Sequence, residues 1–163
     1  EWAAAAGVTS GCNPPFNDMF CPTRHVTRGE LAAFLARAMG VPAGSGDFFT
    51  DDDGIIFEPW LDALASEGVL RGCNPPANDR VCPGRELSRA ELAAVLVRAL
   101  RLEAGAGADF FSDDDGSVFE VDIDRLAHSA ITMGCNPPQN DLFCPDDSLT
   151  RAQLATFLWR AFS

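Results

Sequence analysis

The chain has 163 residues, is 47% hydrophobic and has a formal net charge of −12, with twelve arginines and no lysine. Such acidity argues against a nucleic-acid partner, because neutralising phosphates requires a basic surface. No apolar run approaches the roughly 18 residues that a membrane-spanning helix needs, so we expect no membrane insertion.

One segment, Gly-Cys-Asn-Pro-Pro-x-Asn-Asp-x-x-Cys-Pro, occurs three times along the chain. We therefore predict a single domain, 1–163, made of three repeats: a truncated first repeat, 1–46, then 47–107 and 108–163. A lone repeat of about 60 residues would bury too small a core, so we expect the repeats to share one. The truncation leads us to expect a chain cut from a longer protein.

Each complete repeat should begin with a short helix. Residues 59–69 and 121–131 align with apolar residues at matching places, and residues 1–7 align with the end of the same helix. An acidic turn, Phe-Phe-Thr/Ser-Asp-Asp-Asp-Gly, precedes each complete copy. Gly-rich stretches at 44–46 and 105–107 are typical of joints between repeats.

A second helix should follow each cysteine segment. A capping box begins it at Thr27, Ser88 and Thr150, where a hydroxyl binds a free helix N–H and the Glu or Gln three residues later binds the N–H of the cap. Apolar residues then recur at i, i+3, i+4 and i+7, which predicts one buried face. Glycines at 40 and 105 indicate where the first two such helices stop.

These elements predict an all-α fold, a pseudo-threefold array of helix–loop–helix repeats. The second helices should converge on a common core. We expect three leucines at matching positions to be buried in it: Leu35, Leu96 and Leu158.

The six cysteines form three C-x8-C pairs. Zinc sites favour closer pairs with further Cys or His partners, and His25 and His128 do not complete such a pattern. Six cysteines allow 15 pairings, but the repetition favours one local disulfide per repeat: Cys12–Cys21, Cys73–Cys82 and Cys135–Cys144. Because disulfides persist outside the cytosol, we expect a secreted protein.

An arginine occupies the first turn of each second helix: Arg28, Arg89 and Arg151. A cation there faces the positive end of the helix dipole, which is unfavourable, so its recurrence indicates that each guanidinium is engaged. Two interpretations remain open. One is a structural salt bridge; the other is capture of an anionic ligand, because a guanidinium matches a carboxylate in a bidentate fork.

The two acidic turns share a pattern of alternate carboxylates, a glycine and a later glutamate: Asp51, Asp53 and Glu58, then Asp113, Asp115 and Glu120. Several oxygens around a sharp turn suit Ca²⁺, which would be the cofactor. Alternatively, the aspartates cap the helix that follows. Both interpretations remain open.

Several of these features recur in order along a repeat. They are Phe49-x-Asp51, Trp60, Gly68-Val69, Cys82-Pro83 and Ser88-Arg89-Ala90-Glu91. This pattern resembles the S-layer homology family over nearly the whole chain, although the cysteine pairs and the Asn-Pro-Pro segment depart from it.

The resemblance implies a three-pronged helical domain whose grooves bind acidic, often pyruvylated, cell-wall polymers. The polymer-binding residues would be Arg28, Arg89 and Arg151, with Trp60 as a sugar-stacking residue. Asp122 stands where Trp60 stands in the previous repeat, so the grooves should differ.

We therefore expect a non-catalytic module, located at the cell surface or in the cell wall, that attaches to acidic wall polysaccharide. One alternative is a structural protein that self-assembles head-to-tail into an extracellular layer or filament. Another is an accessory module of a larger secreted enzyme.

Overall fold

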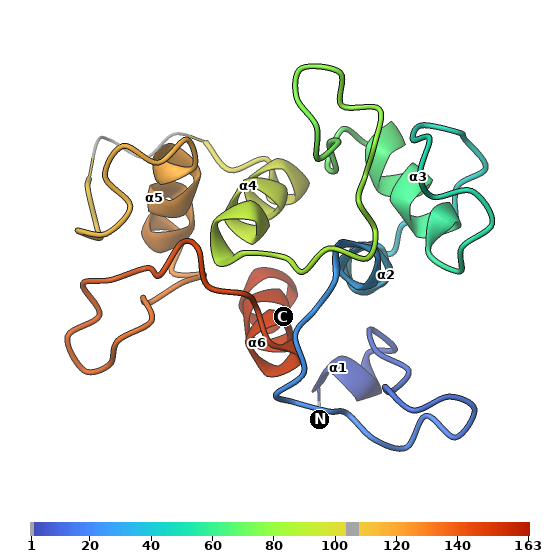
Figure 1. The fold of residues 1–163 in the computed structure, drawn as a ribbon. Coiled ribbons are helices and arrows are strands. Elements are labelled where there is room, and N and C mark those ends of the chain that lie inside the picture. Colours follow the sequence, from blue (N-terminus) through green and yellow to red (C-terminus); the bar gives the residue numbers. More distant parts are fainter. Residues whose placement is uncertain (1, 104–107) are drawn as a thin grey trace. The chain divides into compact units, whose positions relative to one another are not determined.

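The computed structural model describes residues 2–103 and 108–163. These residues form six helices and no β-strand: α1 (Trp2–Ala5), α2 (Arg28–Met39), α3 (Glu58–Ser66), α4 (Arg89–Leu100), α5 (Glu120–His128) and α6 (Arg151–Phe162) (Figure 1). The prediction of an all-α array of helix–loop–helix repeats with local disulfides is confirmed. In this described part of the chain, no helix has the length and apolar character needed to cross a membrane.

The capping boxes set the starts of α2, α4 and α6. At α2 the backbone N–H of Glu30 donates to the hydroxyl of Thr27, and the N–H of Thr27 donates to the Glu30 carboxylate. The other two helices begin in the same way. Gly40, at a φ of +68°, ends α2 as predicted. Helix α4 already ends at Leu100, followed by Arg101 at a φ of +53°; the expected glycine stop at 105 lies outside the described residues.

The first helices are shorter than predicted. Helices α3 and α5 stop three residues before the predicted ends, because Gly68 (φ +70°) and Ala130 (φ +57°) adopt the left-handed conformation that terminates a helix. Neither helix has a side-chain N-cap, so the aspartates of the acidic turns do not cap them.

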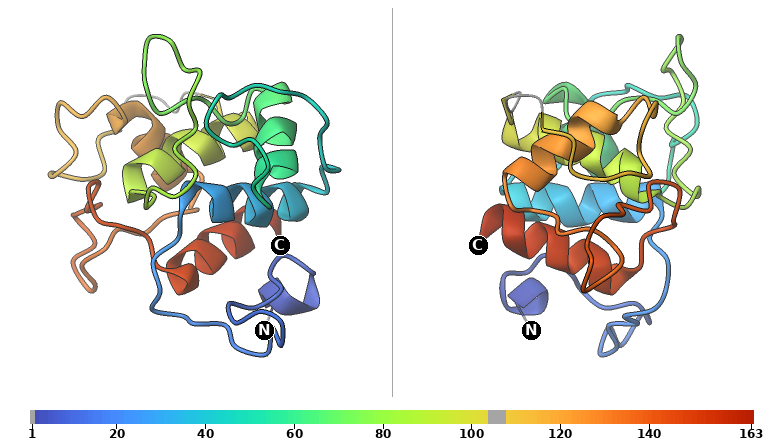
Figure 2. Two further views of the ribbon diagram at one scale, coloured as in Figure 1. Left: turned by 45° about the vertical axis from the view of Figure 1, so that its right-hand side comes forward. Right: turned by 90° about the vertical axis from the view of Figure 1, so that its left-hand side faces the viewer.

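The chain divides into two compact units. One comprises Glu1–Leu87 and Thr150–Ser163, and the other comprises Ser88–Leu149. In the first unit α2 packs against α3 and α6, and α1 packs against α6; in the second, α4 packs against α5 (Figure 2). The expected joint at 105–107 lies outside the described residues. A single domain with one common core stays a prediction.

Apolar side chains fill the space between the packed helices of each unit. The leucines predicted to be buried, Leu35, Leu96 and Leu158, have no exposed surface, which confirms that prediction. Leu61 and Leu64 of α3 face the first core, and Ile123 and Leu126 of α5 face the second; all four are fully buried.

Each cysteine segment folds back as a loop closed by one asparagine. In the first repeat the side-chain N–H of Asn13 donates to the carboxylate of Asp18 at 2.7 Å. The side-chain carbonyl oxygen of Asn13 accepts from the backbone N–H of Met19 at 2.9 Å. The other loops repeat both bonds. Gly11 is required because a Cβ there would lie 2.4 Å from the carbonyl oxygen of Asn17. The disulfide between Cys12 and Cys21 then closes the base of the loop.

Replacing Leu96 with alanine should lower the free energy of unfolding by about 2–5 kcal/mol, because the substitution leaves a cavity in a packed core. Denaturant unfolding followed by circular dichroism measures the loss. Val118→Ala is the matched control in the same unit: its side chain is 90% exposed, and its effect should stay within about 0.5 kcal/mol. Equal losses in the two variants would contradict this packing.

Peptide mapping without reduction should return the three local disulfides and no bridge between repeats. The double variant Cys73→Ser, Cys82→Ser should lose roughly 2.5–3 kcal/mol, because a closed loop of about ten residues restricts the unfolded chain. A disulfide that joins two repeats would contradict the local pairing. Full stability of the double variant would show that the local disulfide does not stabilise the fold.

Candidate functional site

The first-turn arginines are buried against cysteine loops. Each guanidinium donates through Nε to the carbonyl oxygen of the residue that precedes the second cysteine of another repeat. The three pairs are Arg28 with Val81 at 2.7 Å, Arg89 with Phe143 at 2.8 Å and Arg151 with Phe20 at 2.8 Å. All three side chains are at least 95% buried.

Further contacts fix these arginines. Arg28 also donates to the carbonyl oxygen of Arg71 at 2.7 Å. The guanidinium carbon of Arg89 lies 4.8 Å from the centre of the Phe143 ring, within reach of a cation–π interaction. Arg151 lies over two rings and donates to the hydroxyl of Thr9 at 3.0 Å. Backbone carbonyls and aromatic rings thus take part in holding the cation that opposes the helix dipole.

The free N–H groups of the same helix starts are satisfied by the same loops. At α2 the N–H groups of Arg28 and Gly29 donate to the carbonyl oxygens of Arg85 and Pro83, both at 2.9 Å. Helices α4 and α6 repeat this pair of bonds with the loops after Cys144 and Cys21. Side chain and backbone therefore dock each helix start on one loop.

The first aspartate of each acidic turn holds the same loop through its backbone N–H groups. Asp51 accepts from the N–H groups of Val81 and Cys82 at 2.7 and 2.9 Å. Asp113 accepts from Phe143 and Cys144 at 2.7 and 2.8 Å. The peptide before the second cysteine is thus held by an aspartate at its N–H and an arginine at its carbonyl.

The other carboxylates of the expected calcium set have different surroundings. Glu58 accepts from the N–H of Gly54 at 2.6 Å, and Glu120 does the same with Gly116 at 2.8 Å. Asp53 and Asp115 are exposed. Among the described residues, neither predicted trio gathers its oxygens within 4.8 Å of one another, and a calcium site made by these trios stays a prediction.

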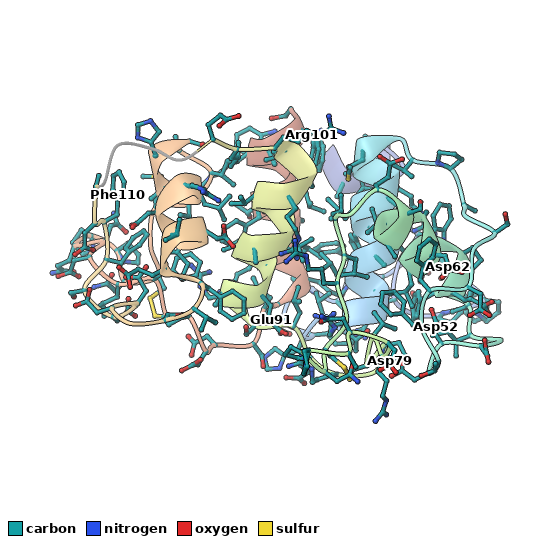
Figure 3. The ribbon with its side chains drawn as sticks, turned by 90° about the horizontal axis from the view of Figure 1, so that it is seen from above. Asp52, Asp62, Asp79, Glu91, Arg101 and Phe110 are labelled. Atoms are coloured by element: carbon teal, nitrogen blue, oxygen red, sulfur yellow. A yellow bond between two sulfur atoms is a disulfide. The ribbon has the colours of Figure 1, made fainter. Side chains whose placement is uncertain are left out.

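Two aspartates that the sequence did not single out are buried in these turns. Asp52 and Asp114 are 2% and 1% exposed. Burial, and next the charge of Asp62, raises the pKa of Asp52 to about 6; Figure 3 shows these two residues in the turn and on α3. Burial, and next the charge of Asp124, raises the pKa of Asp114 to about 6.

A groove of about 330 Å³ lies in the first unit, between the first cysteine loop, α2 and the start of α3. Three arginines line it: Arg24, Arg37 and Arg151. Its apolar lining includes Phe34, Phe57, Ile56 and Trp60, and its single carboxylate among the described residues is that of Glu30. The structure thus brings Trp60 and Arg151 to one groove, whereas Arg28 and Arg89 do not line it.

The groove combines an aromatic face with positive charge. The guanidinium of Arg37 lies 5.3 Å from the centre of the Trp60 ring. Glu30 forms an ion pair with Arg24 and lies 3.8 Å from a terminal nitrogen of Arg151. Burial, and next the charge of Arg24, lowers the pKa of Arg151. The charge of Glu30, which lies beside both Arg24 and Arg151, partly offsets this effect.

Sequence reasoning missed Arg24, Arg37 and the buried aspartates. Arg37 has a counterpart in each repeat, Arg98 and Arg160, and a cation near a helix C-terminus is favourable to the helix dipole without any ligand. Its place in the groove lining and its distance of 5.3 Å from the Trp60 ring show that it also faces a groove. Asp114 lies in an acidic run in which no pattern distinguishes the buried member from the exposed ones.

Replacing Asp51 with alanine should destabilise the protein by about 1.5–3 kcal/mol, because two backbone N–H groups lose a charged acceptor. Thermal and denaturant unfolding measure the loss. Asp53→Ala, two residues away and exposed, should change the stability by less than about 0.5 kcal/mol. If both variants unfold alike, the aspartate does not hold the loop.

No family model matches the chain. It is 27% identical over 145 residues to an amylopullulanase of Thermoanaerobacterium thermosulfurigenes, covering 85% of this chain and 8% of that protein. It is 26% identical over 153 residues to an endoglucanase of Bacillus sp. (strain KSM-635), covering 88% and 16%. It is 25% identical over 145 residues to S-layer protein sap of Bacillus anthracis, covering 86% and 17%.

These matches cover most of this chain but only a small part of each relative. The segment is thus shared by proteins whose names denote different roles. Together with the motif that recurs in three repeats, the matches confirm the resemblance of this chain to the S-layer homology family.

Proposed function

We propose that this chain is a non-catalytic module that attaches a protein to the bacterial cell wall by binding an acidic polysaccharide in the groove of the first unit. The observation that supports this most directly is the lining of the groove. Three of the chain's twelve basic residues meet there beside a tryptophan, in a protein of net charge −12. An acidic ligand is drawn to that place and repelled by most of the remaining surface.

The chemistry of the groove suits a sugar acid. A guanidinium binds a carboxylate through two parallel N–H donors, which fixes both position and orientation. Arg24 is 44% exposed and can reach an incoming ligand. Its present partner, Glu30, is also close to Arg151, so a ligand carboxylate would join an existing charge network rather than create a new one.

Trp60 supplies the apolar part of the site. An indole ring offers a flat face to the C–H side of a sugar ring, and Arg37 holds that ring in place at 5.3 Å. The third repeat has Asp122 at the equivalent position. We infer that the groove that contains Trp60 prefers a different ligand from the equivalent region of the third repeat.

The first-turn arginines divide between two roles in this proposal. Arg151 lines the groove, where its positive charge would attract the polymer, although its side chain is only 2% exposed. Arg28 and Arg89 would support polymer binding by positioning cysteine loops, because their Nε atoms donate to loop carbonyls. The polymer contact predicted for these two residues stays a prediction.

The relatives support attachment rather than catalysis. Segments similar to this chain occur in an S-layer protein and in two named enzymes, where they amount to 17%, 8% and 16% of the length. A shared segment of this size suits an accessory module of larger proteins. The three disulfides support a location outside the cytosol, at the cell surface or wall.

Self-assembly into a surface layer is the second candidate function. The similarity to S-layer protein sap favours it. Sedimentation velocity distinguishes the two: a layer-forming protein should grow with concentration in the absence of wall material, whereas an attachment module should keep its size.

Trp60→Ala and Arg37→Ala should each weaken co-sedimentation with purified Gram-positive cell walls by about tenfold, which corresponds to roughly 1.4 kcal/mol. The reason is the loss of the stacking face or of the cation that holds it. Walls stripped of their acidic polymer should no longer bind the unaltered chain.

Trp159→Ala is the matched control. This tryptophan is 50% exposed and lies on α6 outside the groove lining, so binding should be unchanged. The melting temperatures of the three variants should stay within about 2 °C of the original. Unchanged wall binding by the Trp60 and Arg37 variants would contradict the proposed site.

A further inference from the structure

The turn before α5 gathers carboxylates that serve neither the loop nor the groove. Asp109, Asp114 and Asp115 each place an oxygen within 4.8 Å of the other two. Asp109 and Asp115 are exposed and Asp114 is buried. Three like charges at this separation repel one another strongly unless something of opposite charge lies between them.

The buried member points to a ligand. Asp114 is 1% exposed, and neither of its carboxylate oxygens has a hydrogen-bond partner in another residue that the structure describes. An unpaired buried carboxylate is costly, and buried charges in proteins are ordinarily paired or coordinate a metal ion. Both of its oxygens are therefore available to a cation.

The neighbouring carboxylates are already used. Asp113 accepts two loop N–H groups, Asp124 accepts the N–H of Phe110, and Glu120 accepts the N–H of Gly116. These bonds shape the turn around Asp114. The described structure thus separates carboxylates that build the turn from those that remain open to a ligand.

We propose that Asp109, Asp114 and Asp115 form a Ca²⁺ site in the turn before α5, with Asp114 as the buried ligand. Hard cations take oxygen ligands, and Ca²⁺ accepts six to eight of them in flexible geometry, with water completing the shell. Mg²⁺ demands a near-ideal octahedron, which three aspartates from one turn suit less well. Cys135 and Cys144, close to Asp113, are joined in a disulfide and offer no thiolate to a softer metal.

Bound Ca²⁺ would stabilise the second unit. The same turn contains Asp113, which holds the N–H groups of Phe143 and Cys144. Fixing the turn therefore fixes the third cysteine loop and, through Phe143, the first turn of α4. This site is independent of the groove in the first unit.

The second repeat supplies an internal control. Asp47, Asp52 and Asp53 occupy the equivalent positions. Among the described residues, however, the trio before α5 gathers its oxygens within 4.8 Å of one another, and the trio before α3 does not. We therefore expect one calcium ion per chain.

Isothermal titration of the whole chain with CaCl₂ tests the site, together with melting followed by circular dichroism. We expect one ion per chain, with a dissociation constant of about 10⁻⁴–10⁻³ M, as in extracellular calcium modules. The melting temperature should rise with CaCl₂ and fall back on chelation, because the ion binds only the folded state. MgCl₂ should bind more weakly.

Asp115→Asn should weaken Ca²⁺ binding by at least about tenfold, and the equivalent Asp53→Asn should leave it unchanged. Asp114→Asn should abolish the calcium-dependent rise in melting temperature while keeping the fold, because it removes an unpaired buried charge without changing the shape. No heat and no melting shift up to about 10 mM CaCl₂, well above the expected range, would overturn the proposal. Equal losses of Ca²⁺ affinity in Asp53→Asn and Asp115→Asn would overturn it too. Such a result would mean that Ca²⁺ binds to the general negative charge of the chain and not to one site.

Discussion

The structure depends on one repeated contact, the first-turn arginine of a second helix that donates to the carbonyl before the second cysteine of another repeat. A cation in that turn opposes the helix dipole, and its burial is costly unless it is well bonded. The Nε bonds of 2.7–2.8 Å provide the bonding. Because the free N–H groups of the same helix start bind the same loop, side chain and backbone fix one docking geometry between repeats.

The disulfide loops are consequently structural partners of the helices. In the second and third repeats, the loop is held at its carbonyl by Arg28 or Arg89 and at its N–H groups by Asp51 or Asp113. A loop without regular structure becomes a defined surface in this way. In the first unit, the first cysteine loop, which Arg151 holds at the carbonyl of Phe20, forms one wall of the groove that collects three arginines and Trp60. The contact that docks the repeats thus also builds the candidate binding site.

Charge has two distinct uses in this acidic chain. Some carboxylates, such as those of Asp51 and Glu58, accept hydrogen bonds from backbone N–H groups and so hold turns and loops together. Asp114 has the same residue type and lies beside Asp113, yet it is buried without a bond to another described residue. Its environment suits a metal ion, whereas the environment of Asp113 suits a loop. Position in the fold, rather than residue type, separates the two.

The sequence by itself determined the elements that local chemistry controls. Capping boxes, helical periodicity and a repeated C-x8-C spacing predicted the helices α2, α4 and α6 and the disulfides, since each depends on residues close together in the chain. It did not predict that Asp51 would bind amides 30 residues away, that Arg37 would face Trp60, or that Asp114 rather than Asp113 would be buried. Those outcomes were decided by tertiary structure, because hydrogen-bond partners and burial depend on how distant segments pack, and no local pattern encodes that packing.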